Sequence, residues 1–158
     1  MKFRNASIVA VLVIIFSLML SGCGDPVKTD LQNFDESCAS VTETMTSVEK
    51  SLTAANGDNA GKLLIENAEK LDSTKKTIEA IEVETQEVKD VKSILVEALG
   101  LTAEGCKAIG EAAQNPEQAD QKAVEDAQGK LTKGIELFND FSTKYEELAN
   151  KHGLKIEK

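Results

Sequence analysis

The residue best placed for chemistry is the cysteine that ends the segment Leu20-Ser21-Gly22-Cys23. Sulfur is a strong nucleophile, and the residues before it are small or apolar. The segment closes an apolar run, 8–20, that follows Lys2 and Arg4. A basic start, an apolar run of about a dozen residues and an exit of small residues are typical of a secretory signal.

Leu20-Ser21-Gly22-Cys23 closely resembles the lipobox of bacterial lipoproteins. The resemblance implies that residues 1–22 are a cleaved signal peptide and that Cys23 becomes the first residue of the mature chain. It also implies that the Cys23 sulfur carries a diacylglyceryl thioether, with a further acyl chain such as palmitate, and two lipid chains anchor a protein stably. Two alternatives remain, an uncleaved transmembrane anchor and an ordinary signal peptide cut without lipid. A spanning helix needs about 20 apolar residues, more than this run supplies, and an Ala-x-Ala-like exit is missing.

The rest of the sequence gives little basis for catalysis. His152 is the only histidine, and near the end of the last predicted helix we expect it to lie in a mobile region. Zinc, di-iron and haem sites need several His or Cys at ligand spacing, and a serine triad would have to use His152. The carboxylates Glu82, Glu84, Glu87 and Glu97 are typical of solvated helix faces. We therefore expect no enzymatic activity, no metal and no cofactor apart from the covalent lipid.

Composition indicates an acidic, helical domain. The chain has 158 residues and a formal charge of −9, and removing residues 1–22 removes two bases and no acid, which gives −11. Such a surface disfavours nucleic acid and is repelled by anionic lipid, so the attached lipid has to hold the chain on a membrane. Ala, Glu, Lys, Leu and Gln dominate, a composition typical of long helices.

The first predicted helix has the clearest pattern. Asp25-Pro26 is typical of an N-cap followed by proline at the first helical position. Apolar residues then alternate at steps of four and three, which predicts one buried seam. The seam comprises Val27, Leu31, Phe34, Cys38, Val41, Met45, Val48 and Leu52. The opposite face, with Ser40, Thr44, Ser47 and Ser51, is predicted to be solvated, and Asn56-Gly57 to end the helix.

Three more helices follow by the same argument. The second is predicted over about 59–81 and the third from a turn at Glu82–Thr85, with Thr85 as N-cap, to Gln114. Asn115-Pro116-Glu117-Gln118 has the pattern of a helix start, so the fourth helix is predicted from Pro116 to near His152. The predicted seams are Leu64, Ala68, Leu71, Ile78 and Ile81; Val88, Val91, Leu95, Ala98, Thr102, Cys106 and Ile109; and Val124, Leu131, Ile135, Phe138, Phe141, Tyr145 and Leu148.

Long helices joined by short turns predict an all-α, antiparallel up-down-up-down four-helix bundle with coiled-coil-like seams. The expected organisation is a signal peptide (1–22), a lipidated N-terminus with a short tether (23–25), the bundle (26–152) and a flexible tail (153–158). Glycines in the third and fourth helices indicate close packing, or a helix pair that opens for a partner. They are Gly100, Gly105, Gly110, Gly129 and Gly134. Cys38 and Cys106 would differ in height by about 14 Å in this bundle, so both are predicted to be free, buried thiols.

The whole chain is also similar to small, largely uncharacterised, Gram-positive-type lipoproteins. The similarity rests on the lipobox, the Cys23-Gly24-Asp25-Pro26 opening, the Glu87-Val88 pair, and a last helix rich in Leu, Phe and Tyr that ends in Leu148–Gly153. It implies a lipid-anchored protein on the extracytoplasmic face of a bacterial membrane.

Two functions fit the sequence. One is a protein-interaction or scaffold module that contacts another envelope or extracellular protein, and the alternative is a carrier that holds a small apolar ligand in the bundle core. A carrier needs an unfilled core, whereas the middle of this one is Val, Leu, Ile and Ala with Thr102, which pack well. The sequence favours the interaction module.

Overall fold

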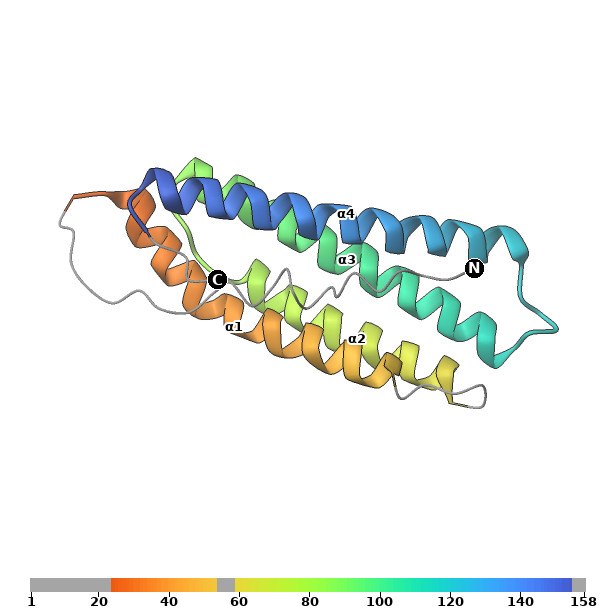
Figure 1. Ribbon diagram of the computed structural model, residues 1–158. Helices are drawn as coiled ribbons and strands as arrows, with labels where there is room; N and C mark the ends of the chain where they lie inside the picture. Colours follow the sequence, from red (N-terminus) through yellow and green to blue (C-terminus); the bar gives the residue numbers. More distant parts are fainter. Residues whose placement is uncertain (1–23, 54–58, 155–158) are drawn as a thin grey trace.

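The computed structural model describes residues 24–53 and 59–154, and the predicted signal peptide and Cys23 lie outside this range. Four helices account for most of it: α1 Pro26–Thr53, α2 Ala60–Glu79, α3 Gln86–Gln114 and α4 Gln121–Lys151 (Figure 1). α3 packs closely against both α2 and α4, and α1 packs mainly against α2. The fold class predicted from the sequence, all-α with four helices, is confirmed. In the described part of the chain, no helix combines the length and apolarity needed to cross a membrane.

α1 begins where the sequence predicts. The Asp25 carboxylate accepts hydrogen bonds from the backbone N–H groups of Val27 (3.1 Å) and Lys28 (3.3 Å), which the helix itself leaves unpaired. The predicted seam is buried from Val27 to Val48, while the Leu52 side chain and the predicted cap at Asn56-Gly57 lie outside the described residues. A regular apolar period with a well-formed cap was therefore sufficient to place this helix and its buried face.

The Ser/Thr face of α1 is not simply solvated, which corrects the prediction. Thr44 shares a 2.7 Å hydrogen bond with Thr74 of α2, and Ser47 accepts one of 3.0 Å from the Lys70 ammonium. Ser40, Thr44 and Ser47 are half-buried. Hydroxyl groups are short enough to let two helices approach and still satisfy their own hydrogen bonds, so this face lies along α2.

The connection between α2 and α3 spans residues 80–85, close to the predicted turn. Lys92 reaches back from α3 and donates to the carbonyl oxygens of Glu79, at 2.8 Å, and Ile81. A cation at the C-terminal end of a helix also opposes the partial negative charge of the helix dipole. Thr85 is the N-cap residue of α3, as predicted, but its hydroxyl makes no capping bond to the helix and donates to Asp30 instead.

α4 begins at Gln121 and not at Pro116. Residues 115–118 form a single turn, closed by the bond from the Gln118 N–H to the Asn115 carbonyl (3.0 Å). Asp120 is the actual N-cap, and its carboxylate accepts from the Lys122 N–H at 2.8 Å. Asn115 and Asp120 lie five positions apart, and the first ends α3 while the second begins α4.

The seam predicted for α4 is wrong at one position. Ile135 is 39 % exposed, whereas its neighbour Gly134 is buried against Ala98 and Thr102 of α3. Phe138, Phe141, Tyr145 and Leu148 are buried as predicted. Glycine does not count as an apolar residue in a periodicity pattern. The pattern therefore predicted that its isoleucine neighbour, and not Gly134, lies at the interface.

Small residues bring α3 close to both neighbours. A Cβ atom on Gly110 would lie 2.7 Å from the Gly61 carbonyl oxygen of α2, and one on Gly105 would lie 2.8 Å from the Ala127 carbonyl oxygen of α4. These distances are shorter than real Cβ contacts. Close packing is therefore confirmed for Gly105, Gly110 and Gly134. It is wrong for Gly129, which has no neighbour within 4 Å, and Gly100 is in ordinary contact with Lys75.

Larger side chains fill the space between α1 and the other helices. Phe34 lies edge-on to Phe141, with 6.3 Å between ring centroids, and 6.2 Å from Tyr145. Cys38 and Cys106 are both free and buried, as predicted. Burial raises the pKa of the Cys106 thiol to about 11 and that of Cys38 further, where the charge of Asp35 adds to the effect.

Candidate functional site

The residue with the clearest predicted chemistry, Cys23, directly precedes the described chain. Gly24 is the only residue between it and Asp25, and Gly24 has a φ of +125°, a conformation that favours glycine. Two consecutive Cα–Cα steps span at most about 7.6 Å. Any group attached to the backbone of Cys23 therefore begins next to the first turn of α1, and the candidate site is the end of the molecule around Asp25.

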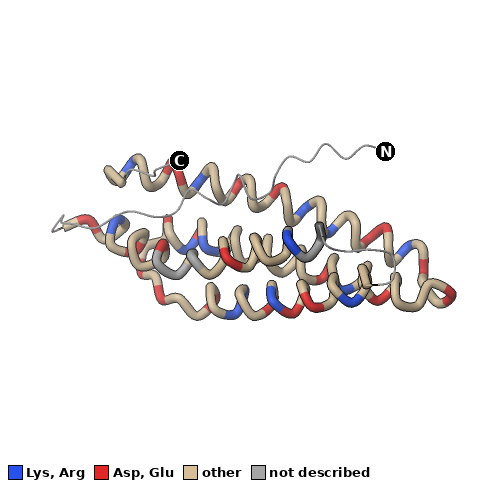
Figure 2. The backbone as a smooth tube through the Cα atoms, turned by 60° about the horizontal axis from the view of Figure 1, so that its bottom comes forward, with Lys and Arg blue, Asp and Glu red and all other residues tan. Residues whose placement is uncertain are grey.

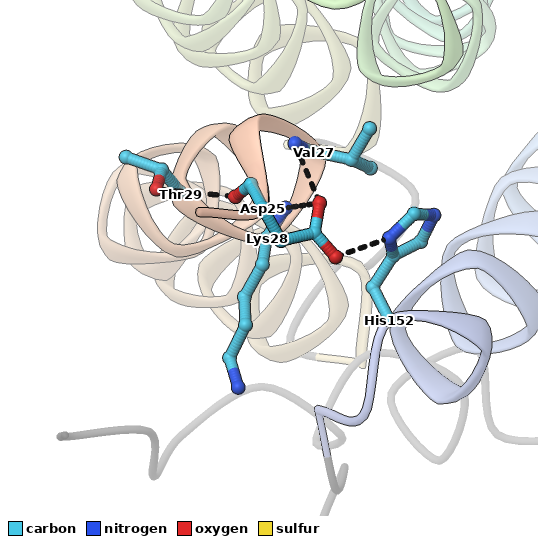
Figure 3. Close-up of polar contacts among 5 residues, drawn as sticks. All are labelled: Asp25, Val27, Lys28, Thr29 and His152. Atoms are coloured by element: carbon cyan, nitrogen blue, oxygen red, sulfur yellow. Dashed lines mark hydrogen bonds and ion pairs between the residues drawn. The ribbon is translucent and has the colours of Figure 1, made fainter. Parts of the chain in front are cut away.

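Asp25 joins the beginning of α1 to the end of α4. Its Oδ1 atom caps α1, and its Oδ2 atom accepts a hydrogen bond of 2.7 Å from Nδ1 of His152 (Figure 3). The bond to His152, together with the backbone N–H groups of Lys28 and Val27, holds the pKa of Asp25 below its ordinary value. The Lys28 side chain extends away from the imidazole (Figure 3). We call the Asp25–His152 contact the clasp.

His152 is held in place, which corrects its predicted position in a mobile region. Its side chain is only 15 % exposed, and it is the C-cap residue of α4, with its N–H bonded to the Leu148 and Ala149 carbonyls. Nε2 of the imidazole is buried and has no hydrogen-bond partner among the described residues. Among the described residues, no hydroxyl or thiol therefore lies within hydrogen-bond distance of this nitrogen.

The chain after α4 is also ordered further than predicted. The Leu154 N–H bonds the Ala149 carbonyl at 2.9 Å and the Gly153 N–H bonds the Asn150 carbonyl at 3.1 Å. With Gly153 at φ +69°, these bonds form a Schellman motif. Leu154 is 2 % exposed and packs into the core. The predicted flexible tail is therefore wrong for 153–154, and residues 155–158 lie outside the described range.

Asp30 is a second structural carboxylate at this end, and the sequence analysis missed it. It is 7 % exposed, and its Oδ2 atom accepts three hydrogen bonds: from the Glu84 N–H (2.8 Å), the Thr85 N–H (2.6 Å) and the Thr85 hydroxyl (2.7 Å). Burial opposes ionisation, but these bonds outweigh it, so the pKa of Asp30 lies below its ordinary value. Asp30 lies three residues after Val27 and four before Phe34, and an acid on a buried seam is a signal that could have predicted it.

Asp35 adds a third link from α1. Its carboxylate accepts a 2.8 Å hydrogen bond from the Tyr145 hydroxyl of α4. Burial and the Asp35 charge raise the pKa of Tyr145, so the phenol stays protonated and remains a donor. Asp25, Asp30 and Asp35 thus connect the first third of α1 to the end of α4, to the α2–α3 connection and to the body of α4.

In 24–53 and 59–154, no group of three or more His, Cys, Asp or Glu side chains is arranged to hold a metal ion. Glu82, Glu84, Glu87 and Glu97 are exposed, as their assignment to solvated faces requires. Asp25, Asp30 and Asp35 are all engaged in contacts that hold α1 in place.

An open hollow of about 540 Å³ lies between α2 and α3. Lys75 and Glu79 line it from α2, where their charged groups are 3.6 Å apart. Its α3 side carries Lys89, Lys92, Ser93, Val96, Glu97, Gly100, Leu101 and Glu104. Lys89 and Lys92 donate to backbone carbonyls of the α2–α3 connection and of the end of α2, so both lysines have a structural role.

Comparison with known proteins places the chain in one family. Residues 28–153, which contain nearly all of α1 to α4, match the family described as Uncharacterised lipoprotein PM1805. No curated protein and no solved structure matched the chain. The match agrees with the bacterial lipoprotein expected from the lipobox, while the Gram-positive-type assignment stays a prediction. By this match over most of its length, the chain belongs to the Uncharacterised lipoprotein PM1805 family.

Proposed function

We propose that the chain is a lipid-anchored module on the extracytoplasmic face of a bacterial membrane, where it binds another envelope or extracellular protein. Membership of a lipoprotein family is the observation that carries the anchoring. Cys23 is the proposed lipid acceptor, because it ends the lipobox and stands two residues before the cap of α1. The proposal assigns the chain no enzymatic reaction, no metal or cofactor beyond the covalent lipid, and no nucleic-acid partner.

Contacts between the helices support an up-down-up-down bundle as the architecture of the module. The beginning of α2 lies against the end of α3 at Gly61 and Gly110, and the middle of α3 lies against α4 at Gly105. The end of α4 meets the beginning of α1 at the clasp. Such an arrangement leaves long outward faces on every helix.

Surface character supports binding to a protein rather than carriage of an apolar ligand. Acidic and basic residues alternate along the helices (Figure 2), and several pair with each other, as Lys130 and Glu104 do between α4 and α3. Buried side chains from all four helices form one core. The hollow between α2 and α3 is open rather than enclosed, so it would leave much of an apolar ligand exposed to water, whereas carrier pockets bury most of their ligand.

The anchoring part is tested by Cys23→Ala in cells fed a clickable fatty acid. Cysteine is the lipid acceptor in this proposal, so the variant loses the label and leaves the membrane fraction or accumulates as an unprocessed precursor. Cys106→Ala is the matched control, because it removes a buried thiol and keeps Cys23. A Cys23→Ala protein that still takes up label and stays membrane-bound contradicts the proposal.

The binding part is tested by a photo-crosslinking residue at Glu97, in the hollow, or at Ile135, on the exposed face of α4. Crosslinking in intact cells is expected to give a discrete protein adduct at one of these positions. Protein purified under native conditions is extracted in parallel with organic solvent. A stoichiometric apolar compound in the extract, without any protein adduct, would favour the carrier and overturn the interaction module.

A further inference from the structure

Three segments that are distant in sequence meet at one end of the molecule. They are the start of α1, the α2–α3 connection and the end of α4 (Figure 1). The clasp joins the first and third segments, and the three hydrogen bonds of Asp30 join the first and second. Four of the exposed residues at this end are Thr29, Glu82, Glu84 and Lys151, and we call these four the collar.

The collar is also the end from which the tether leaves. Gly24 alone separates Cys23 from Asp25, and Asp25 is fixed twice, by its cap of α1 and by the clasp. A longer or looser tether would let the module rotate freely above the membrane. This one has a length of about two Cα–Cα steps, so the attached lipid begins beside the collar.

We propose that the collar faces the lipid headgroups of the membrane that holds Cys23, and that the clasp fixes the module in this orientation. The inference rests on the proposed lipid anchor. The partner of the collar is a lipid surface, because only Gly24 lies between Asp25, at this end of the molecule, and Cys23, the proposed lipid-bearing residue. The collar carries both signs of charge, from Glu82, Glu84 and Lys151, so it is not a basic patch that would bind anionic lipid by itself.

The opposite end then stands well above the membrane. α4 has 31 residues, so at 1.5 Å per residue the 115–120 connection lies about 45 Å from the collar along the helix. In this orientation the sides of the helices and the 115–120 connection are open to a partner protein, while the collar is not.

Lipid-borne quenching tests the orientation on the full-length, lipidated protein in phosphatidylcholine vesicles that carry a nitroxide lipid. A fluorescent non-canonical amino acid replaces Glu82, in the collar, or Glu117, in the 115–120 connection; both are exposed glutamates outside the helices. The Glu82 probe is expected to be quenched at least fivefold more than the Glu117 probe. Equal quenching, or stronger quenching at Glu117, overturns the orientation. Vesicle flotation is measured separately, and failure to float overturns the lipid anchor instead.

The clasp is tested by repeating the measurement in His152→Ala, which leaves the cap of α1 intact. The ratio of quenching between the two probes is expected to fall at least twofold while flotation is unchanged. His152→Gln, whose amide N–H can donate to Asp25, is expected to restore part of the ratio. Asp120→Ala is the matched control, because it removes a helix cap at the other end of α4 and must leave the ratio unchanged.

Far-UV circular dichroism confirms that each variant is folded before quenching is compared. A folded His152→Ala protein with the ratio of the unaltered chain shows that the clasp does not set the orientation. A ratio that falls equally in Asp120→Ala shows that general loss of stability, and not the clasp, is responsible.

Discussion

Replacing Asp30 with alanine is expected to destabilise the folded chain by about 2–4 kcal/mol. The carboxylate accepts three hydrogen bonds of 2.6–2.8 Å and is 7 % exposed. A hydrogen bond to a charged group contributes about 1.5–3 kcal/mol, but Glu84 is exposed and Thr85 half-buried, so water replaces part of what is lost. For a domain of this size, each kcal/mol corresponds to a change in Tm of about 3–5 °C.

Two milder variants separate the contribution of the Asp30 charge from that of its hydrogen bond to the Thr85 hydroxyl. Asp30→Asn keeps one acceptor oxygen without the charge, and is expected to cost about 1–2 kcal/mol. Thr85→Val removes only the hydroxyl donor and is expected to cost about 1 kcal/mol. Urea unfolding followed by circular dichroism measures all three, and a double-mutant cycle between positions 30 and 85 isolates the coupling between the two side chains. A loss under 1 kcal/mol for Asp30→Ala would refute the reasoning that this carboxylate holds the α2–α3 connection.

The pH dependence gives Asp30 an independent check. Its pKa in the folded chain lies below the ordinary value, and an unfolded aspartate titrates near 3.9. The stabilisation is therefore complete above about pH 5 and is lost as the pH falls through the folded pKa. The difference in stability between the unaltered chain and Asp30→Asn is expected to shrink between about pH 5 and pH 3, and a difference that grows in this range contradicts the assignment.

Three other changes test the packing. Gly110→Ala places a Cβ atom 2.7 Å from the Gly61 carbonyl oxygen and is expected to lower the free energy of unfolding by about 1–3 kcal/mol. Gly129 has open space around it, so Gly129→Ala is expected to raise the free energy of unfolding by up to about 1 kcal/mol. Urea titrations measure both variants, and equal effects would contradict the close contact between α2 and α3. Tyr145→Phe loses the bond to a carboxylate and is expected to cost about 1–2 kcal/mol by the same assay, and no loss would show that this bond adds nothing. Burial raises the pKa of Cys106 to about 11, so alkylation at pH 8 is expected to be slow in the folded chain and fast in urea, as mass spectrometry would show; fast labelling without urea would contradict burial.

Periodicity and caps predicted most of the fold. The α1 seam and its cap at Asp25 follow from local sequence alone, because each depends on residues at most four positions apart. The errors in α4 have a different origin. Asn115 and Asp120 are both good helix caps, and only the path of the chain between α3 and α4 decides which one begins the helix. Gly134 is buried because a helix backbone approaches it closely, which an apolar pattern does not register.

The collar end could be predicted only in part. The lipid attachment proposed at Cys23 is predicted from the lipobox. In contrast, Asp30 contacts backbone groups 54 and 55 residues away, and Asp25 contacts His152 across 127 residues. No local rule pairs residues at these separations. A charged residue on an otherwise apolar seam does predict that a partner exists, and the three-dimensional fold identifies it as the α2–α3 connection.

Two kinds of helix contact in this chain have different consequences. α2, α3 and α4 pack against each other through glycines and alanines, so their backbones lie close together. At these contacts a single added methyl group would clash with the neighbouring helix. α1 instead packs through large side chains such as Phe34, and is held near its start by Asp25, Asp30 and Asp35. These polar contacts fix the position and register of α1, and they add stability as well. α1 is the helix that follows the predicted lipid site. Its polar contacts therefore lie where a force on the lipid anchor would first act on the folded domain.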